Sequence, residues 1–240
     1  MSRQLRIAAW AAGALAAVTL LAHGVVKGSS STPPAEAPKP LETSRPQQFG
    51  VVHGVFASRQ RLLTRGATSQ RDVVIYLTAE RASTLPPPTA PAVVTQERLR
   101  FEPHVLAIRS GSTVKFLNKD DVDHNVFATE KCCAMDLMMS PRSEKSVTFK
   151  ETGVSSIVCR LHPEMSLWVL VLRDPWFTQV QLEKQKEGDG ATYSAEYRIP
   201  DVPPGDYKLT FWNKKLRPVE YKVTVAAGGQ TRLDISIEDE

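Results

Sequence analysis

Four residues with metal-binding side chains define the most informative part of this 240-residue chain. Cys159, His162 and Met165 follow one another at positions i, i+3 and i+6, in a short segment between two apolar runs. A loop of this length can curl around one ion and direct a thiolate, an imidazole and a thioether inward. The fourth residue, His124, lies upstream, after a turn rich in Asn and Asp.

Two imidazoles and a thiolate with a weak thioether are the ligand set of a copper site that transfers electrons. The soft sulfur ligands favour Cu(I), whereas imidazole also serves Cu(II). Zinc is the main competitor because Cys and His suit it, but Met is a poor zinc ligand. All four positions would be filled by side chains, which leaves none for a substrate. The sequence therefore predicts one copper ion with no catalytic role, and a protein that is not an enzyme.

The elements that must position these residues are β-strands. Between the turn signals, apolar residues alternate or cluster in short runs, which is the pattern of strands. No long amphipathic helix is expected after the N-terminal segment. The runs are Val73–Leu77, Val105–Ile108, Thr113–Leu117, Ser146–Phe149, Ser156–Val158, Leu167–Leu172, Tyr193–Ile199, Tyr207–Trp212 and Tyr221–Val225. The fold class predicted is all-β, of sandwich type.

The N-terminus has the pattern of an export signal. Arg3 and Arg6 precede an apolar stretch that runs to about Val26, so residues 1–27 are expected to be a cleaved signal peptide or an uncleaved membrane anchor helix. Residues 28–48 are rich in Ser, Pro and Ala and are expected to form a disordered linker. Both alternatives place the rest of the chain in the periplasm or cell envelope, with a membrane tether if the segment is uncleaved.

Composition excludes some functions. The net charge is only +4, and the basic residues form no run, so nucleic-acid binding is not expected. The three cysteines cannot form a complete set of disulfides. Cys132 and Cys133 are adjacent, and we do not expect them to bridge easily without a distorted peptide.

Further short motifs occur before the Cys159–Met165 loop, at Phe101–Val105, Gly111–Val114, Phe116–Asn118, Asp121 and His124–Phe127. They resemble the first half of the signature of plastocyanin-like cupredoxins, and Cys159–Met165 resembles its second half, with a spacing similar to that of amicyanin. The resemblance covers about residues 93–173. It implies a Greek-key sandwich with type-1 blue copper at one end. It also implies that Asn125 hydrogen-bonds the loop that carries Cys159, and that electrons pass at a partly exposed His162. Asn125 as a simple turn residue is the alternative.

A second β-sandwich is expected at residues 174–240. Tyr197–Thr210 resembles the late strands of carboxypeptidase-regulatory-like, transthyretin-like modules. Residues 49–80 resemble the first strands of such a module, so the cupredoxin would be inserted between Leu77 and Pro175. The alternative is that residues 49–80 are extra cupredoxin strands. The whole order resembles bacterial proteins labelled methylamine-utilisation-like, which does not establish a substrate.

One segment departs from the cupredoxin pattern. Five sulfur-containing residues occur close together: Cys132, Cys133, Met135, Met138 and Met139. They suggest an auxiliary Cu(I) site. The favoured alternative is a loop packed with polarizable side chains. His53 and His104 have no ligand partners in the sequence and are expected to be ordinary surface or packed histidines.

The leading functional hypothesis is a periplasmic one-electron carrier between a redox protein donor and acceptor, such as a dehydrogenase or cytochrome. One alternative is copper storage or delivery, in which the sulfur-rich segment takes part. Another is a cell-envelope binding module with a structural copper. An oxidase or nitrite reductase is not expected, because such enzymes need a second copper centre with an open position.

Overall fold

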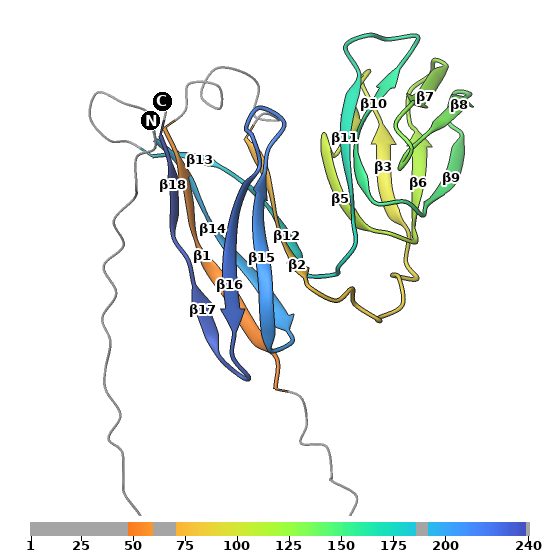
Figure 1. Cartoon of the computed structure of the whole chain (residues 1–240). Helices are drawn as coiled ribbons and strands as arrows, with labels where there is room; N and C mark the ends of the chain where they lie inside the picture. The colour runs from red at the N-terminus through yellow and green to blue at the C-terminus, as the bar shows by residue number, and fades with distance from the viewer. Residues whose placement is uncertain (1–47, 60–70, 186–191, 239–240) are drawn as a thin grey trace, which may run out of the picture. The chain divides into compact units, whose positions relative to one another are not determined.

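The computed structural model describes residues 48–59, 71–185 and 192–238, and every regular element in these ranges is a β-strand (Figure 1). The all-β prediction is therefore confirmed. The predicted N-terminal signal or anchor helix and almost all of the predicted linker lie outside the described residues. Within the described ranges, no helix is long and apolar enough to cross a membrane.

One sandwich contains the candidate metal ligands. Its first sheet has the order β4-β3-β6-β9 and its second the order β5-β11-β10-β7-β8. The strands are β3 (Ala92–Gln96), β4 (Phe101–Glu102), β5 (Val105–Arg109), β6 (Ser112–Asn118), β7 (His124–Ala128), β8 (Met135–Met139), β9 (Glu144–Phe149), β10 (Gly153–Cys159) and β11 (Ser166–Leu172).

The core of this sandwich follows from alternation along its strands. In β6, buried and half-buried residues alternate from Ser112 to Asn118, so that Val114 and Phe116 face inward. Successive side chains on a strand point to opposite faces, and this pattern gives one apolar face to the core. Val126, Ile157 and Leu167 from the opposite sheet complete the same core.

The second sandwich is built from strands on both sides of the first one in sequence. Its sheets have the orders β13-β14-β1-β17, with β18 also paired to β1, and β12-β2-β15-β16. The strands are β1 (Gly50–Ser58), β2 (Asp72–Ala79), β12 (Phe177–Gln181), β13 (Glu183–Gln185), β14 (Thr192–Val202), β15 (Gly205–Trp212), β16 (Val219–Val225), β17 (Gln230–Arg232) and β18 (Ile235–Ile237).

Strands from residues 49–80 pair with strands from the C-terminal part of the chain, across a long sequence gap. β1 pairs with β14 along most of its length, and β2 pairs with both β12 and β15. This is the pairing that an inserted cupredoxin predicts. In the described part of the chain, β1 and β2 pair with no strand of the metal-containing sandwich.

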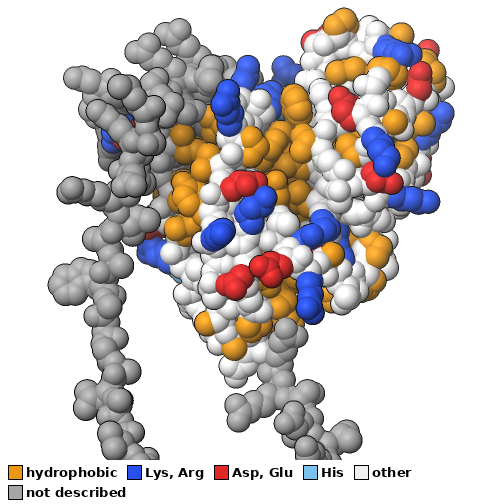
Figure 2. All heavy atoms as spheres, in the orientation of Figure 1, with side chains coloured by type: hydrophobic (Ala, Val, Ile, Leu, Met, Phe, Trp, Pro, Cys, Tyr) orange, Lys and Arg blue, Asp and Glu red, His pale blue; other side chains and the backbone are white. Residues whose placement is uncertain are grey.

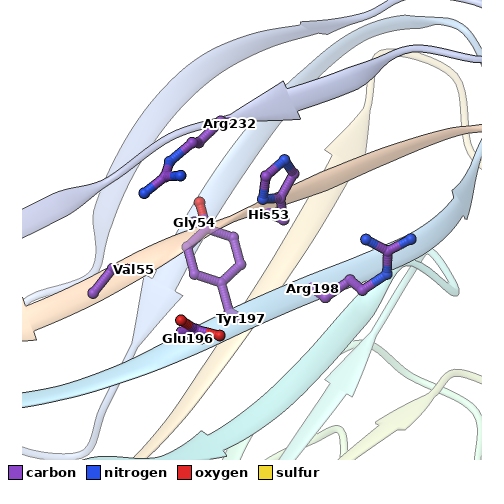
Figure 3. Close-up of a pocket in the computed structure, with 7 residues that line it drawn as sticks. All are labelled: His53, Gly54, Val55, Glu196, Tyr197, Arg198 and Arg232. Atoms are coloured by element: carbon purple, nitrogen blue, oxygen red, sulfur yellow. The ribbon is translucent and has the colours of Figure 1, made fainter.

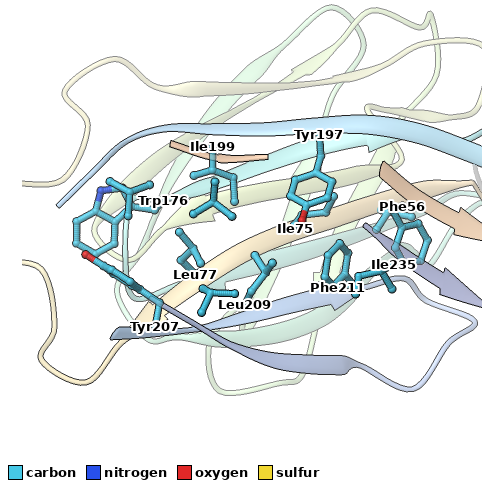
Figure 4. Close-up of a cluster of buried hydrophobic side chains, with 14 of the residues drawn as sticks. Phe56, Ile75, Leu77, Trp176, Tyr197, Ile199, Tyr207, Leu209, Phe211 and Ile235 are labelled. Atoms are coloured by element: carbon cyan, nitrogen blue, oxygen red, sulfur yellow. The ribbon is translucent and has the colours of Figure 1, made fainter. Parts of the chain in front are cut away.

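Aromatic rings fill the core of this second sandwich. Phe56 and Phe211 stack with their centroids 5.1 Å apart, and Tyr197 meets Phe211 edge to face at 5.5 Å (Figure 4). At another point, Trp176 meets Tyr207 edge to face at 5.5 Å. Such pairs add about 0.5–1.5 kcal/mol each beyond the burial of their area.

A third apolar cluster joins residues of the two sandwiches. Val105 and Leu170 from the first pack with Val74 and Trp212 from the second, and the rings of Trp212 and Trp168 lie 5.9 Å apart.

On the face that Figure 2 presents, basic side chains lie interspersed with acidic and apolar ones.

The sulfur-rich segment differs from its prediction as a loop. Residues Met135–Met139 form strand β8, which pairs with β7 so that Met139 lies opposite His124 and Met135 opposite Ala128. Met138 is 51 % exposed, whereas Met139 is fully buried. Neighbouring side chains on a strand point to opposite faces, so the strand separates these two sulfurs.

Candidate metal centre

Strand ends bring the candidate ligands together. His124 is the first residue of β7 and Cys159 the last residue of β10, and these strands pair antiparallel with Cys159 opposite Val126. The carboxyl end of β10 therefore lies beside the amino end of β7. The loop that follows Cys159 carries His162 and leads through Met165 into β11.

Backbone hydrogen bonds give this loop its curl. The Met165 N–H donates to the His162 carbonyl at 3.0 Å, and the Cys159 N–H donates to the Met165 carbonyl at 3.2 Å. These bonds close a compact turn between two neighbouring strands. Met165 is fully buried in the core of the sandwich.

The side chains of His124, Cys159 and His162 form one cluster, in which the ligand atoms all lie within 4.8 Å of one another. Cys159 Sγ is 3.9 Å from His124 Nδ1 and 3.6 Å from His162 Nδ1, and the two Nδ1 atoms are 3.1 Å apart. Three donors of this kind facing one point are suited to a single small ion.

Burial differs within the cluster. His124 is fully buried and Cys159 is 2 % exposed, whereas His162 is half-buried. Leu161, beside His162, is 49 % exposed. The cluster is thus closed on the core side and meets the surface at His162.

Asp120 orients the ring of His124. Its Oδ2 lies 2.9 Å from His124 Nε2, which leaves Nδ1 for Cys159 and His162. Carboxylates that hold the far nitrogen of a metal-binding imidazole fix its orientation and increase its basicity. The sequence analysis did not identify Asp120, although a carboxylate four residues before a candidate ligand was the available signal.

The Asp120 carboxylate is itself held by the backbone. The N–H groups of Arg98 and Leu99 donate to it at 2.6 and 3.1 Å, and both residues have a left-handed backbone. Burial raises the pKa of Asp120, but the bonds from Leu99, His124 and Arg98 outweigh burial and lower the pKa below its ordinary value. Asp120 therefore stays ionised beside His124.

Asn125 faces the metal cluster through its backbone and Asp136 through its side chain. Its backbone N–H points at Cys159 Sγ, 3.4 Å away. Its side-chain amide donates to Asp136 Oδ1 at 2.7 Å, and Asp136 in turn pairs with Arg160 at 3.0 Å. The side chain thus reaches the Cys159 loop through Asp136. Its Oδ1 is buried without a partner in the described structure.

The five sulfurs of the suggested auxiliary site do not converge on one point. The Cys132 and Cys133 sulfurs touch each other at 2.8 Å, in the turn that joins β7 to β8. Met139 lies opposite His124 at the other end of that hairpin, and Met138 points away from it. The described geometry therefore provides no single position for an ion that contacts all five.

His53 and His104 are not members of the cluster. His53 lines a hollow of about 270 Å³ on the second sandwich, with Arg198 and Arg232 from the neighbouring strands (Figure 3). His104 is half-buried and bonds the Ser166 carbonyl through Nδ1 and Lys214 Nζ through Nε2, at 2.9 and 2.6 Å.

Comparison with known proteins supports a copper site in the first sandwich. Residues 89–172 match the family of copper-binding proteins named plastocyanin/azurin. No curated protein is similar enough to the chain to count as a match.

Similar solved structures cover the same part of the chain. A Cu(I) form of an amicyanin variant has 25 % sequence identity and a TM-score of 0.33, and the match covers 40 % of this chain and 99 % of amicyanin. An oxidised amicyanin variant has 27 % identity and a TM-score of 0.33, with 42 % and 98 % covered. A purple cupredoxin from Nitrosopumilus maritimus has 22 % identity and a TM-score of 0.30, with 34 % and 99 % covered.

The donor set fits the metal that this family binds. One thiol and two imidazoles converge, and imidazole together with soft sulfur suits copper in both of its common oxidation states. The first sandwich of this chain is a cupredoxin domain of the plastocyanin/azurin family, and its cofactor is one copper ion.

Proposed function

We propose that the chain is an exported one-electron carrier, in which His124, Cys159, His162 and Met165 hold a type-1 copper. The observation that carries this proposal is the convergence of His124, Cys159 and His162 within 4.8 Å, inside the segment that matches the copper-binding family. When bound, copper supplies a one-electron couple between Cu(II) and Cu(I).

The residues around the cluster would hold the ligand side chains in place in both oxidation states of a bound copper. Asp120 fixes the His124 ring, the Asn125 N–H faces Cys159 Sγ, and the Met165 backbone closes the loop. A site whose ligands do not move on reduction needs little reorganisation, which favours fast electron exchange. Met165, as the fourth ligand, would contribute a thioether, which is a soft ligand that suits Cu(I).

The closed side of the cluster argues against catalysis. His124, Cys159 and Met165 are buried, and these three with His162 would occupy all the ligand positions. Substrate chemistry at a metal needs an open position. The proposed chain is therefore a carrier and not an enzyme.

His162 is the proposed point of electron exchange. It is the half-buried member of the cluster. Two exposed apolar side chains occur nearby: Leu161 precedes His162 in sequence, and Met138 contacts Asn125, the residue after His124. Such a surface suits brief docking of redox proteins, as donor and as acceptor, because small apolar contacts release quickly. A cytochrome and a dehydrogenase are the proposed classes of partner. The N-terminal sequence pattern supports a location in the periplasm or cell envelope for this exchange.

The visible absorption spectrum of the copper-loaded, oxidised protein tests the proposal. We expect an intense thiolate-to-copper charge-transfer band that reductant bleaches and that is lost in Cys159→Ala. A matched control is Cys132→Ala, which removes a thiol outside the cluster and should keep the band. A colourless protein that still binds copper would contradict the electron-transfer role and would favour storage or a structural metal.

A further inference from the structure

Two neighbouring cysteines outside the metal cluster lie in a tight turn between β7 and β8. The Cys133 N–H donates to the Glu130 carbonyl at 2.8 Å, which closes the turn. Cys132 is 8 % exposed and Cys133 3 %, although Lys131 and Ala134 on either side are exposed. The two sulfurs are thus tucked under a turn that itself lies at the surface.

The distance between these sulfurs favours a bond over a shared metal ion. The two Sγ atoms are 2.8 Å apart. Two thiolates on one tetrahedral zinc ion, each at about 2.3 Å, would stand about 3.8 Å apart. A disulfide needs about 2.0 Å. Chelation would have to push the sulfurs apart by about 1 Å, whereas bond formation continues the approach that the turn already imposes.

The surroundings also favour an uncharged product. Burial, followed by the hydrogen bond and charge of Cys132, raises the pKa of the Cys133 thiol, so a thiolate ligand is disfavoured there. A disulfide carries no charge and needs no hydrogen-bond donor, so it fits an apolar position. The glycine at position 153 leaves room for the Cys132 sulfur, because a Cβ on residue 153 would lie 3.1 Å from Cys132 Sγ.

The turn is braced from the neighbouring strand. The Ser155 hydroxyl donates to Glu130 Oε2 at 2.6 Å, which ties the start of the turn to β10. Each sulfur contacts the other, and the Ser155 side chain also hydrogen-bonds the Cys133 thiol. Both cysteines are free in the structure, with their sulfurs in contact.

We propose that Cys132 and Cys133 are a redox modification site, which small organic disulfides convert into a vicinal disulfide. The Cys132 sulfur, as its thiolate, attacks one sulfur of R–S–S–R, whose S–S bond breaks and releases one thiol. The Cys133 thiol then gives its proton to solvent, and its sulfur displaces the second thiol from the mixed disulfide. Two protein thiols are oxidised by two electrons, and the organic disulfide is reduced to two thiols.

This site is separate from the metal centre. Cys132 packs against Gly153, the first residue of β10, whereas Cys159 is the last residue of that strand. At about 3.4 Å per residue, the strand separates the two by about 20 Å. The vicinal disulfide should therefore form without consuming the Cys159 thiol, and the proposal does not depend on the copper function.

Peptide mass spectrometry tests the proposal on the full-length, metal-free protein. The protein is incubated with oxidised glutathione, denatured, alkylated with iodoacetamide and digested with trypsin. Cleavage after Lys131 and Arg142 isolates both cysteines in one peptide, and cleavage after Lys150 and Arg160 isolates Cys159 in another. We expect the first peptide to carry no alkyl group and to be two hydrogen atoms lighter than its reduced form.

The variants give the controls. Cys133→Ser should stop at a glutathione adduct on Cys132, because the sulfur that resolves the mixed disulfide is missing. In the native sequence, two alkylated cysteines in the first peptide would overturn the proposal, and so would a stable glutathione adduct. The Cys159 peptide reports separately on the metal-site thiol, so failure of the copper assignment cannot be mistaken for failure of this one.

Discussion

Asp120 Oδ2 lies 2.9 Å from His124 Nε2 and leaves the other ring nitrogen of His124 facing Cys159 and His162. Asp120 is in turn held by two backbone N–H groups. The ring that would bind copper is therefore fixed from the side opposite to the metal, by a carboxylate that cannot easily move.

Replacing this carboxylate should weaken copper binding. Asp120→Asn removes the charge that makes the imidazole basic, and the loss of such a partner typically costs about 10–100-fold in metal affinity. Copper affinity is measured by competition with a chelator. The matched control is Asp121→Asn, because Asp121 is 82 % exposed and pairs with Arg142 instead of a cluster residue. Equal affinities in Asp120→Asn and the wild type would refute the orienting role.

Met165→Leu should raise the reduction potential while the copper stays bound. The thioether stabilises Cu(II) weakly, so its loss favours Cu(I), whereas the two imidazoles and the thiolate remain. The swap conserves volume and should cost less than about 1.5 kcal/mol of stability. Voltammetry measures the potential. Met135→Leu, at the far end of the β7–β8 hairpin, is the control and should leave it unchanged. An unshifted potential in Met165→Leu would argue against Met165 as the axial ligand.

The contact between His104 and Lys214 should make stability depend on pH. An ammonium group only donates, so His104 Nε2 accepts from Lys214 and Nδ1 carries the proton that bonds the Ser166 carbonyl. Burial, together with the charge of Lys214, lowers the pKa of His104. Below about pH 6.5 the unfolded chain therefore binds more protons at His104 than the folded chain does. The free energy of unfolding consequently decreases as the pH is lowered.

Lys214→Met should reduce this dependence, because the repulsion of protonated His104 by Lys214 is lost and the pKa of His104 rises. NMR titration of the imidazole gives the pKa directly, and urea unfolding at several pH values gives the stability. Lys215→Met is the control, since Lys215 is exposed and has no bond to His104. A His104 pKa that does not rise in Lys214→Met would contradict the assignment.

Gly54→Ala should destabilise the second sandwich without changing the copper spectrum. A Cβ at Gly54 would lie 2.0 Å from the Leu233 carbonyl oxygen, which accepts a hydrogen bond from the Tyr197 hydroxyl at 2.7 Å. Backbone atoms must shift to make room, and overpacking of this kind typically costs about 1–3 kcal/mol. The free energy of unfolding in urea measures the loss. His53→Ala, on the solvent side of the same strand, should stay within about 0.5 kcal/mol of the wild type. Equal stability of Gly54→Ala and His53→Ala would show that the contact is not tight.

The sequence by itself determined the strands and the types of the candidate ligands. Alternating apolar residues predicted runs such as Val73–Leu77, which lies within β2, and the segment Cys159–Met165 indicated a copper-binding loop. These signals are readable because strand periodicity and loop spacing are local properties of the chain. The prediction of a loop over the sulfur-rich segment fits the turn at Cys132 and Cys133 but is wrong at Met135–Met139, because pairing with β7 outweighed a composition that packs equally well in a loop.

Only the tertiary structure decided which distant groups meet. Composition does not reveal that β1 pairs with β14 across the inserted domain, because strand partners depend on long-range packing and on register. The Asp120–His124 bond and the Asn125–Asp136 bond likewise depend on how a turn and a hairpin fold over the strand ends. Adjacent cysteines can point apart or together, and the turn at Glu130 brings their sulfurs into contact because its hydrogen bond fixes the backbone between them.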